Sequence, residues 1–156
     1  MPTNCRNTRS IAQKCADILE VDIPIRDASP VGVAPEEIKI PDSNKRREKL
    51  TEVISEWISK GKMKPSQIAV LSPYEQAKSS LNGADRLRKI PLTTDQQTWR
   101  AGNGVLFATI KGFKGLEADA VVLTDVPNSE SDPYFNKADF YVACSRAKHL
   151  LVILNK

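Results

Sequence analysis

The chain has 156 residues, enough for one domain with a hydrophobic core, and its 40% hydrophobic and 27% charged residues are ordinary for a globular protein. No apolar run reaches the roughly 18 residues that a membrane span requires, and the polar N-terminus lacks the apolar core of a secretory signal, so we expect no membrane segment and a cytoplasmic location. The net charge of +4 permits binding to a polyanion without requiring it. Three cysteines without CxxC spacing and a single histidine argue against a metal site.

The first half of the chain is predicted to alternate helices with short strands. Apolar spacing and chain-breaking residues predict, in order, a helix over 8–19, short strands over 21–25 and 37–40, a helix over 45–60, a strand over 67–71 and a helix near 74–81. Asp42 or Ser43 is expected to cap the helix over 45–60, and Gly61 to end it.

The second half continues the alternation. It predicts a strand over 90–92, a loop or short helix over 93–100, a strand over 105–109, a turn over 112–117, a strand over 120–124, a polar loop over 128–132, a helix over 138–147 and a strand over 150–154. Strands that alternate with helices predict an α/β fold with a largely parallel sheet. Ligands of such sheets lie beyond the carboxyl ends of the strands, and we expect the loop after Thr109 and the helix before Leu150 to face that edge.

Two aromatic residues in polar surroundings are candidates for contact with a base. Trp99 lies in a polar segment, where it is expected either to be exposed and stack on a base or to cover a sheet edge. Tyr74, after Ser72-Pro73, lies near the end of a predicted strand and is a weaker candidate for the same cleft.

A phosphate-binding loop is absent from this sequence. ATP hydrolysis needs backbone amides and a lysine around the phosphates, usually as G-x-x-x-x-G-K-[ST], and the KGFKG at 111–115 has the wrong spacing. No strand ends in Asp-Glu to hold magnesium. The chain alone is therefore not expected to hydrolyse ATP or to hold a nucleotide or metal.

Two segments carry groups suited to phosphate chemistry. Residues 109–117, TIKGFKGLE, place a Gly-rich turn after an apolar strand and end in a carboxylate. Residues 141–148, YVACSRAK, place Arg146 among small side chains that permit close approach. Arginine is always ionised, and its planar fork contacts two oxygens at once, which suits charge that develops on a γ-phosphate. Taken alone, Arg146 is better interpreted as an ordinary helical arginine in a surface ion pair.

Three separated segments resemble the motifs of the UvrD/Rep/PcrA-like superfamily 1 helicases. NCRNTRSI at 4–11 resembles motif IV, residues 109–117 resemble motif V with its KGLE intact, and YVACSRA at 141–147 resembles motif VI. They occur in the family's order and span nearly the whole chain. The resemblance implies a RecA-like three-layer fold, with residues 1–156 forming a single C-terminal (2A) motor domain of a longer helicase.

The resemblance also implies roles for individual residues. ATP, with Mg²⁺, would bind in the full-length protein between this domain and an N-terminal RecA-like domain of the same polypeptide. Arg6 and Arg146 would approach the γ-phosphate as catalytic arginines, and Gly115 and Glu117 would belong to the nucleotide site. Thr109 and Lys111 would contact single-stranded DNA, with RNA as an open alternative.

Some positions depart from the family pattern. Cys5 stands where the family often has a tyrosine that stacks on adenine, and Lys111 and Gly112 replace a frequent histidine and serine.

The alternative function is a stand-alone RecA-like module that binds nucleic acid or a protein partner without ATPase activity.

Overall fold

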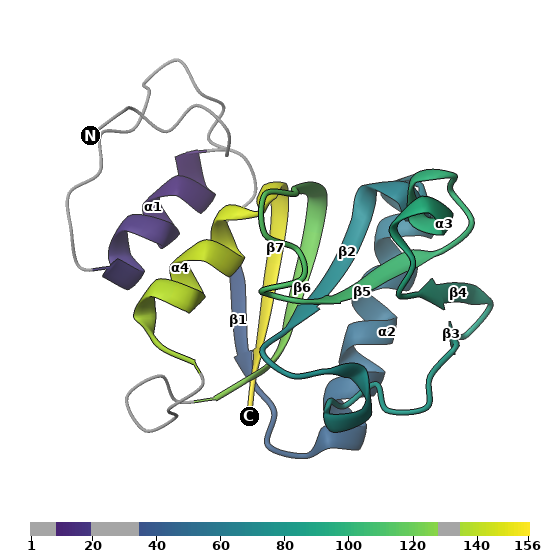
Figure 1. Ribbon diagram of the computed structural model, residues 1–156, viewed down its shortest axis with the longest axis horizontal. Coiled ribbons are helices and arrows are strands. Elements are labelled where there is room, and N and C mark those ends of the chain that lie inside the picture. The colour runs from purple at the N-terminus through teal and green to yellow at the C-terminus, as the bar shows by residue number, and fades with distance from the viewer. Residues whose placement is uncertain (1–8, 20–34, 128–134) are drawn as a thin grey trace.

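The computed structural model describes residues 9–19, 35–127 and 135–156, and these form a layered α/β structure (Figure 1). Within them, one sheet has the strand order β1-β7-β6-β2-β5-β4-β3, and every neighbouring pair is parallel except β3 and β4. The strands are β1 (Glu36–Lys39), β2 (Ile68–Ser72), β3 (Arg86–Leu87), β4 (Ile90–Thr93), β5 (Val105–Thr109), β6 (Ala118–Val126) and β7 (Ala147–Asn155).

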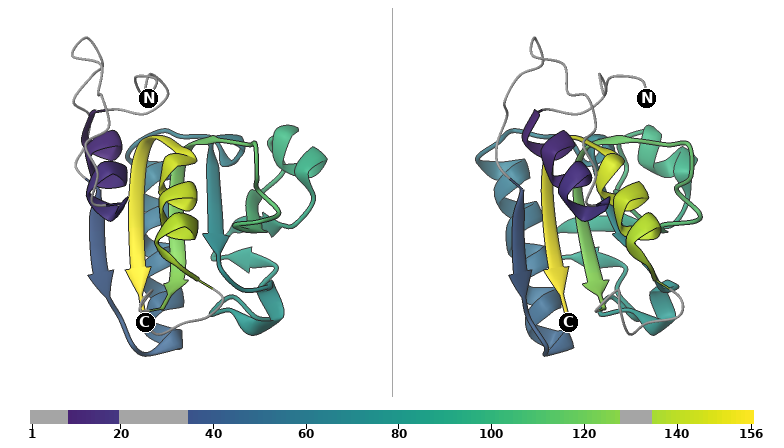
Figure 2. Two further views of the ribbon diagram at one scale, coloured as in Figure 1. Left: turned by 60° about the vertical axis from the view of Figure 1, so that its left-hand side comes forward. Right: turned by 90° about the vertical axis from the view of Figure 1, so that its left-hand side faces the viewer.

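Helices cover both faces of the sheet. Two of them, α1 (Arg9–Leu19) and α4 (Lys137–Ser145), lie side by side on one face, and α2 (Ser43–Ser59) covers the other (Figures 1 and 2). The short α3 (Gln96–Arg100) precedes β5. The predicted α/β fold with a mostly parallel sheet is confirmed.

The period-two alternation of the strands divides the core between these faces. β2 directs Ala69 and Leu71 into the cluster under α1 and α4, and Ile68 and Val70 into the cluster under α2. All five residues of β2 are buried, which explains why this strand reads as a continuous apolar run.

Most elements lie where the sequence predicts them. α2 begins at Ser43 and is capped by Asp42, whose carboxylate accepts hydrogen bonds from the amides of Asn44 and Lys45 at 2.8 and 3.1 Å. β6 is longer than predicted, and the two-residue β3 was missed. The strand expected over 21–25 and the loop expected over 128–132 lie outside the described residues.

The helix predicted near 74–81 is wrong. Only a 3₁₀ turn, η2 (Gln76–Lys78), forms there. The Gln76 amide donates to the carbonyls of Leu81 and Ala84, and Ser80 donates through its backbone amide to Asp125. These polar side chains satisfy backbone groups in a non-helical path and so compete with the helix.

Trp99 is buried rather than exposed. Its indole N–H donates to the carbonyls of Ile68 at 2.9 Å and Pro65 at 3.1 Å, and its ring packs edge-on against Phe113 with centroids 5.9 Å apart. Of the two alternatives for Trp99, stacking on a base is wrong, because its only donor and its ring are both used inside the protein.

A buried ion pair joins α2 to the end of β6. Arg46 Nε lies 2.9 Å from Asp125 Oδ1, with 6% and 2% of the two side chains exposed. Arg46 also donates to the carbonyls of Ile40 and Pro41, and Asp125 Oδ2 accepts from the amide and hydroxyl of Ser80. Asp125 adopts φ +59°, next to a register shift in the β6–β7 pairing. This network fixes the segment that follows β2 to the sheet.

Candidate functional site

Because the strands run parallel, their carboxyl ends lie together and their amino ends lie together; we call these two sides of the sheet its carboxyl edge and its amino edge. At the carboxyl edge β2 and β5 end together, with Ser72 paired to Thr109. At the amino edge β6 and β7 begin together, with Ala118 paired to Ala147. The predicted site residues divide between these two edges.

Residues 110–117, here called the crossover segment, connect the edges. Because β5 and β6 run in the same direction, the chain must travel from the end of one to the start of the other, across a face of the sheet. Ile110 and Phe113 are buried in the core cluster under α1 and α4, so the segment is packed onto the sheet. Gly115 has φ +81°, which a residue with a side chain adopts only with strain.

Arg146 lies at the amino edge, at the C-cap of α4. Its Nε donates to the carbonyl of Val142 at 3.2 Å, Nη1 to that of Leu116 at 3.4 Å, and Nη2 to the Ser145 hydroxyl at 3.2 Å. Its own carbonyl accepts from the Ala118 amide at 3.0 Å. The arginine therefore ties the end of α4 to the end of the crossover segment.

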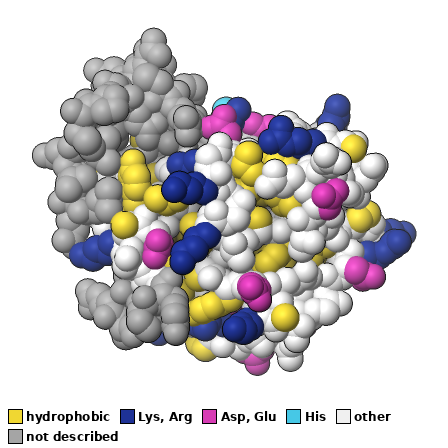
Figure 3. All heavy atoms as spheres, viewed as in Figure 1, with side chains coloured by type: hydrophobic (Ala, Val, Ile, Leu, Met, Phe, Trp, Pro, Cys, Tyr) yellow, Lys and Arg dark blue, Asp and Glu magenta, His cyan; other side chains and the backbone are white. Residues whose placement is uncertain are grey.

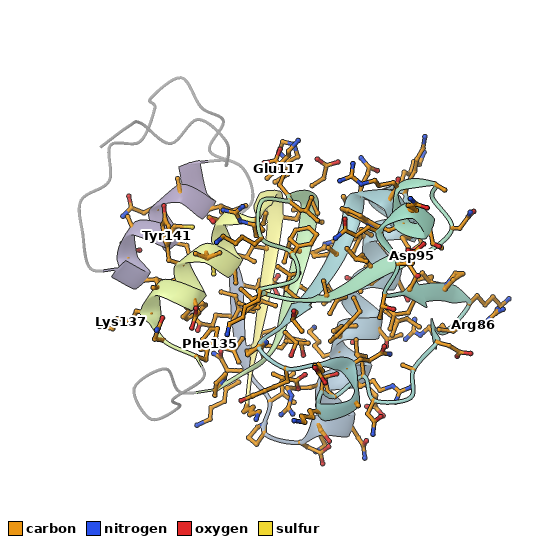
Figure 4. All side chains as sticks on the ribbon, in the orientation of Figure 1. Arg86, Asp95, Glu117, Phe135, Lys137 and Tyr141 are labelled. Atoms are coloured by element: carbon orange, nitrogen blue, oxygen red, sulfur yellow. The ribbon has the colours of Figure 1, made fainter. Side chains whose placement is uncertain are left out.

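Glu117 lies at the same edge as Arg146. Figure 4 places it where β6 and β7 begin, and Lys148 Nζ lies 3.3 Å from its Oε1. About a third of each of these two side chains is exposed, so the pair is a surface salt bridge of the kind that contributes roughly 0–1 kcal/mol.

Helix α1 packs beside Arg146. Burial raises the pKa of the Cys15 thiol to about 12, and the positive charge of Arg146 offsets only part of that effect. Cys15 is thus an unreactive core residue that lies close enough to Arg146 for the guanidinium charge to affect its pKa. Arg6, the second predicted arginine, lies outside the described residues.

Thr109 and Lys111 lie at the carboxyl edge, where they line a hollow of about 590 Å³. We call this the carboxyl-edge hollow; it is lined by Pro73, Tyr74, Glu75, Lys78, Thr109, Ile110, Lys111, Phe135 and Asp139. The structure thus brings the two predicted nucleic-acid residues together with Tyr74 and with a lysine, Lys78, that the sequence analysis missed. Lys78 was missed because it was assigned to a helix that does not form.

The hydroxyl of Thr109 has a structural partner. Its Oγ1 accepts a hydrogen bond from the Gly112 amide at 2.9 Å and so stabilises the turn that starts the crossover segment. A Cβ added at Gly112 would lie 3.0 Å from that oxygen, which explains why a glycine suits this position.

Tyr74 is half-buried at the rim of the hollow. Lys156 Nζ lies 4.4 Å from its ring centroid and 3.2 Å from its hydroxyl oxygen. The ring therefore already accepts a cation on one face, and that cation adds to the positive charge near the hollow.

The expectation that the loop after Thr109 and the helix before Leu150 face the carboxyl edge holds only in part. The first turn of α4 does reach that edge, since Asp139 lines the carboxyl-edge hollow. Arg146, at the last turn of α4, immediately precedes β7 and lies at the amino edge. The helix runs antiparallel to the strands, so its first turn lies at the carboxyl edge and its last turn at the amino edge.

Within the described ranges, no helix is long and apolar enough to cross a bilayer. The same residues contain no group of three or more metal-ligating side chains of the kind that His, Cys, Asp and Glu supply.

Residues 104–154 match the family described as UvrD-like helicase C-terminal domain, which confirms the resemblance stated from the motifs for this part of the chain. The structure is similar to that of the C-terminal domain of a possible DNA helicase from Lactobacillus plantarum WCFS1. The similarity has a TM-score of 0.73 at 20% sequence identity and covers 96% of this chain and 86% of that one, so it shows the fold. No curated protein matches this chain in sequence.

Proposed function

We propose that this chain, whose residues 104–154 match the UvrD-like helicase C-terminal domain, is the second motor domain of an ATP-dependent superfamily 1 DNA helicase or translocase. Its amino edge would serve ATP held by a separate N-terminal RecA-like domain, and its carboxyl edge would contact single-stranded DNA. The observation that carries this proposal is the crossover segment, which joins Thr109 directly to Glu117 and, through Leu116, to the guanidinium of Arg146.

The amino edge has the chemistry that a γ-phosphate requires. Among the described residues, the guanidinium of Arg146 donates to carbonyl and hydroxyl oxygens, which do not neutralise its charge. A positioned arginine of this kind stabilises the charge that develops on phosphate oxygens during transfer. Arg6 would add a second guanidinium, and Glu117 would accept hydrogen bonds from the ribose hydroxyls.

The carboxyl edge has the chemistry that a single strand requires. Lys78 and Lys111 are exposed and can contact phosphates, while the aromatic ring of Tyr74 can contact a base. Glu75 and Asp139 also line the hollow. The position of each lysine, rather than net positive charge, would therefore decide where the phosphates lie.

The crossover segment would couple the two edges. When ATP draws the amino edge toward the phosphate-loop domain, the bond between Arg146 and Leu116 transmits that displacement to the crossover segment. Thr109 and Lys111, at the other end of the segment, would then shift relative to the strand. This is domain closure linked to a second binding site, and the linkage requires nucleotide and DNA to alter each other's affinity equally.

The test is DNA-stimulated ATP hydrolysis by the polypeptide that carries both motor domains. Arg146→Ala is expected to lower kcat about a thousandfold while single-strand affinity changes less than about twofold. Arg100→Ala, which removes an exposed arginine from the end of α3, is the matched control and should be silent. A loss under about threefold in Arg146→Ala would reject the catalytic arginine. Single-strand binding without any ATPase activity in the intact polypeptide would favour the stand-alone module.

A further inference from the structure

A second hollow lies on the other face of the sheet, between α2 and the turn that joins β3 to β4. Its volume is about 500 Å³, and it is lined by Asn44, Arg47, Glu48, Thr51 and Arg88. Four of these residues recur at helical spacing and form one stripe along the first turns of α2. We call this the helix–hairpin hollow; it shares no lining residue with the carboxyl-edge hollow.

Arg88 is held in an unusual backbone conformation. Its φ is +59°, in the left-handed region that glycine occupies freely and that a residue with a Cβ adopts at a cost. The tight β3–β4 turn requires such a residue between Leu87 and Ile90. An arginine at this position points to a use for its side chain, because the turn itself would be more stable with glycine.

Neither arginine is neutralised within the described residues. Arg47 donates a hydrogen bond to the carbonyl of Asn82 at 3.5 Å, and the ion pairs of this part of the chain include neither Arg47 nor Arg88. Arg86 and Lys89 are exposed on the same hairpin. Figure 3 shows basic side chains projecting at the right-hand edge of the molecule, where Figure 4 places Arg86. Glu48 also lines the hollow and Asp85 precedes the hairpin, so two carboxylates accompany the four cations Arg47, Arg86, Arg88 and Lys89.

Charges on an edge strand also prevent edge-to-edge pairing, and β3 is the last strand of the sheet. That function does not require a hollow, and it does not account for Arg47, which comes from α2. The two guanidinium groups approach one cavity from elements 41 positions apart in the chain, together with the amide of Asn44 and the hydroxyl of Thr51. This set of donors suits a phosphate oxygen.

The helix–hairpin hollow is also linked to the carboxyl edge. α2 starts close after β1 ends, so its first turns lie toward the carboxyl ends of the strands. The chain that carries Tyr74 and Lys78 continues to Asn82, whose carbonyl accepts the hydrogen bond of Arg47. The buried Arg46–Asp125–Ser80 network fixes this stretch between the two hollows.

We propose that the helix–hairpin hollow is a second phosphodiester-binding site, in which Arg47 and Arg88 contact the nucleic-acid backbone and Asn44 and Thr51 complete its hydrogen bonding. This proposal rests on the proposed function, in which the domain binds DNA. The phosphodiester comes either from the same single strand after it leaves the carboxyl-edge hollow or from the duplex that adjoins that strand.

The test compares fluorescence anisotropy of labelled short oligothymidylate, long oligothymidylate and a duplex with a single-stranded tail. Arg47→Gln/Arg88→Gln is expected to weaken binding at least about tenfold and to reduce the salt slope by about 1.4 for two single-strand phosphates. Loss with the long single strand and the tailed duplex assigns the site to the same strand. Loss with the tailed duplex alone assigns it to the duplex. No loss with any of the three probes overturns the proposal.

Three further variants keep the result interpretable. Lys60→Gln/Lys62→Gln removes the same charge from the opposite end of α2, where Lys62 also has a positive φ of 53°, and should leave binding unchanged. Arg88→Gly suits the backbone and should leave the Tm unchanged or higher while it weakens binding; a lower Tm with full binding contradicts a ligand role for this side chain. Lys111→Gln separates the two proposals, because binding lost there and retained in Arg47→Gln/Arg88→Gln leaves the proposed function standing alone.

Discussion

The amino and carboxyl edges of the sheet present charge in opposite ways. At the amino edge, Arg146 is half-buried and held by three side-chain hydrogen bonds, so its guanidinium has a defined position. At the carboxyl edge, Lys78 and Lys111 are exposed around an open hollow. A fixed arginine suits a small ligand whose reacting atoms must be met accurately, whereas flexible lysines suit a polymer whose phosphates are interchangeable.

The two edges also differ in how they are supported. Beneath the carboxyl edge, Arg46 and Asp125 form a buried pair that holds Ser80 and hence the chain leading from Tyr74. At the amino edge, the charged pair of Glu117 with Lys148 is partly exposed and weak. The carboxyl edge is therefore supported by a buried ion pair, while the amino edge is supported by the hydrogen bonds of Arg146 between α4 and the crossover segment.

The largest expected effect on activity separates charge from shape at the amino edge. Arg146→Lys keeps the positive charge and loses the planar fork, so we expect kcat for ATP hydrolysis in the two-domain polypeptide to fall about a hundredfold. Single-turnover hydrolysis measures it. Activity close to wild type would mean that the defined position of the guanidinium has no role.

The second prediction addresses the support of the carboxyl edge. Asp125→Ala leaves the buried guanidinium of Arg46 without its carboxylate, and we expect the free energy of unfolding to fall by about 3–5 kcal/mol. Urea denaturation of the chain measures it. Asp119→Ala, which alters a partly exposed carboxylate of the same strand, is the control and should cost less than about 1 kcal/mol.

The third prediction addresses the segment that joins the edges. Gly115→Ala meets no heavy atom within 4 Å, so its cost arises from the backbone at φ +81° and should be about 1–3 kcal/mol. Gly115→Asn, whose side chain tolerates the left-handed region, should cost visibly less than Gly115→Ala in the same urea titration. Equal costs would show that the backbone conformation is not the cause.

The smallest effect concerns one contact at the carboxyl edge. Lys111→Ala is expected to reduce the slope of log affinity against log salt by about 0.7 for single-stranded DNA, while ATPase activity at saturating DNA stays within about twofold. Anisotropy over a series of salt concentrations measures the slope. An unchanged slope together with a lost ATPase activity would reverse the roles assigned to the two edges.

Local patterns in the sequence determined much of this protein. The alternation of apolar runs with amphipathic helices predicted the parallel sheet and most of its strands, because residue periodicity follows directly from backbone geometry. Asp42 was one of two predicted caps and is the one that forms, since capping depends on residues a few positions away. The resemblance to the helicase motifs depended on short segments at 109–117 and 141–147, which lie in the part of the chain that matches the helicase family.

Tertiary structure alone decided which groups share an edge and which charges are buried. Arg46 reads as an ordinary polar-face residue until Asp125, 79 positions away, joins it in the interior. Trp99 reads as exposed until carbonyls from another segment accept its N–H. Thr109 and Arg146 lie at opposite edges because the chain must cross the sheet between two parallel strands. The direction of a strand depends on the whole sheet, and no single motif contains it.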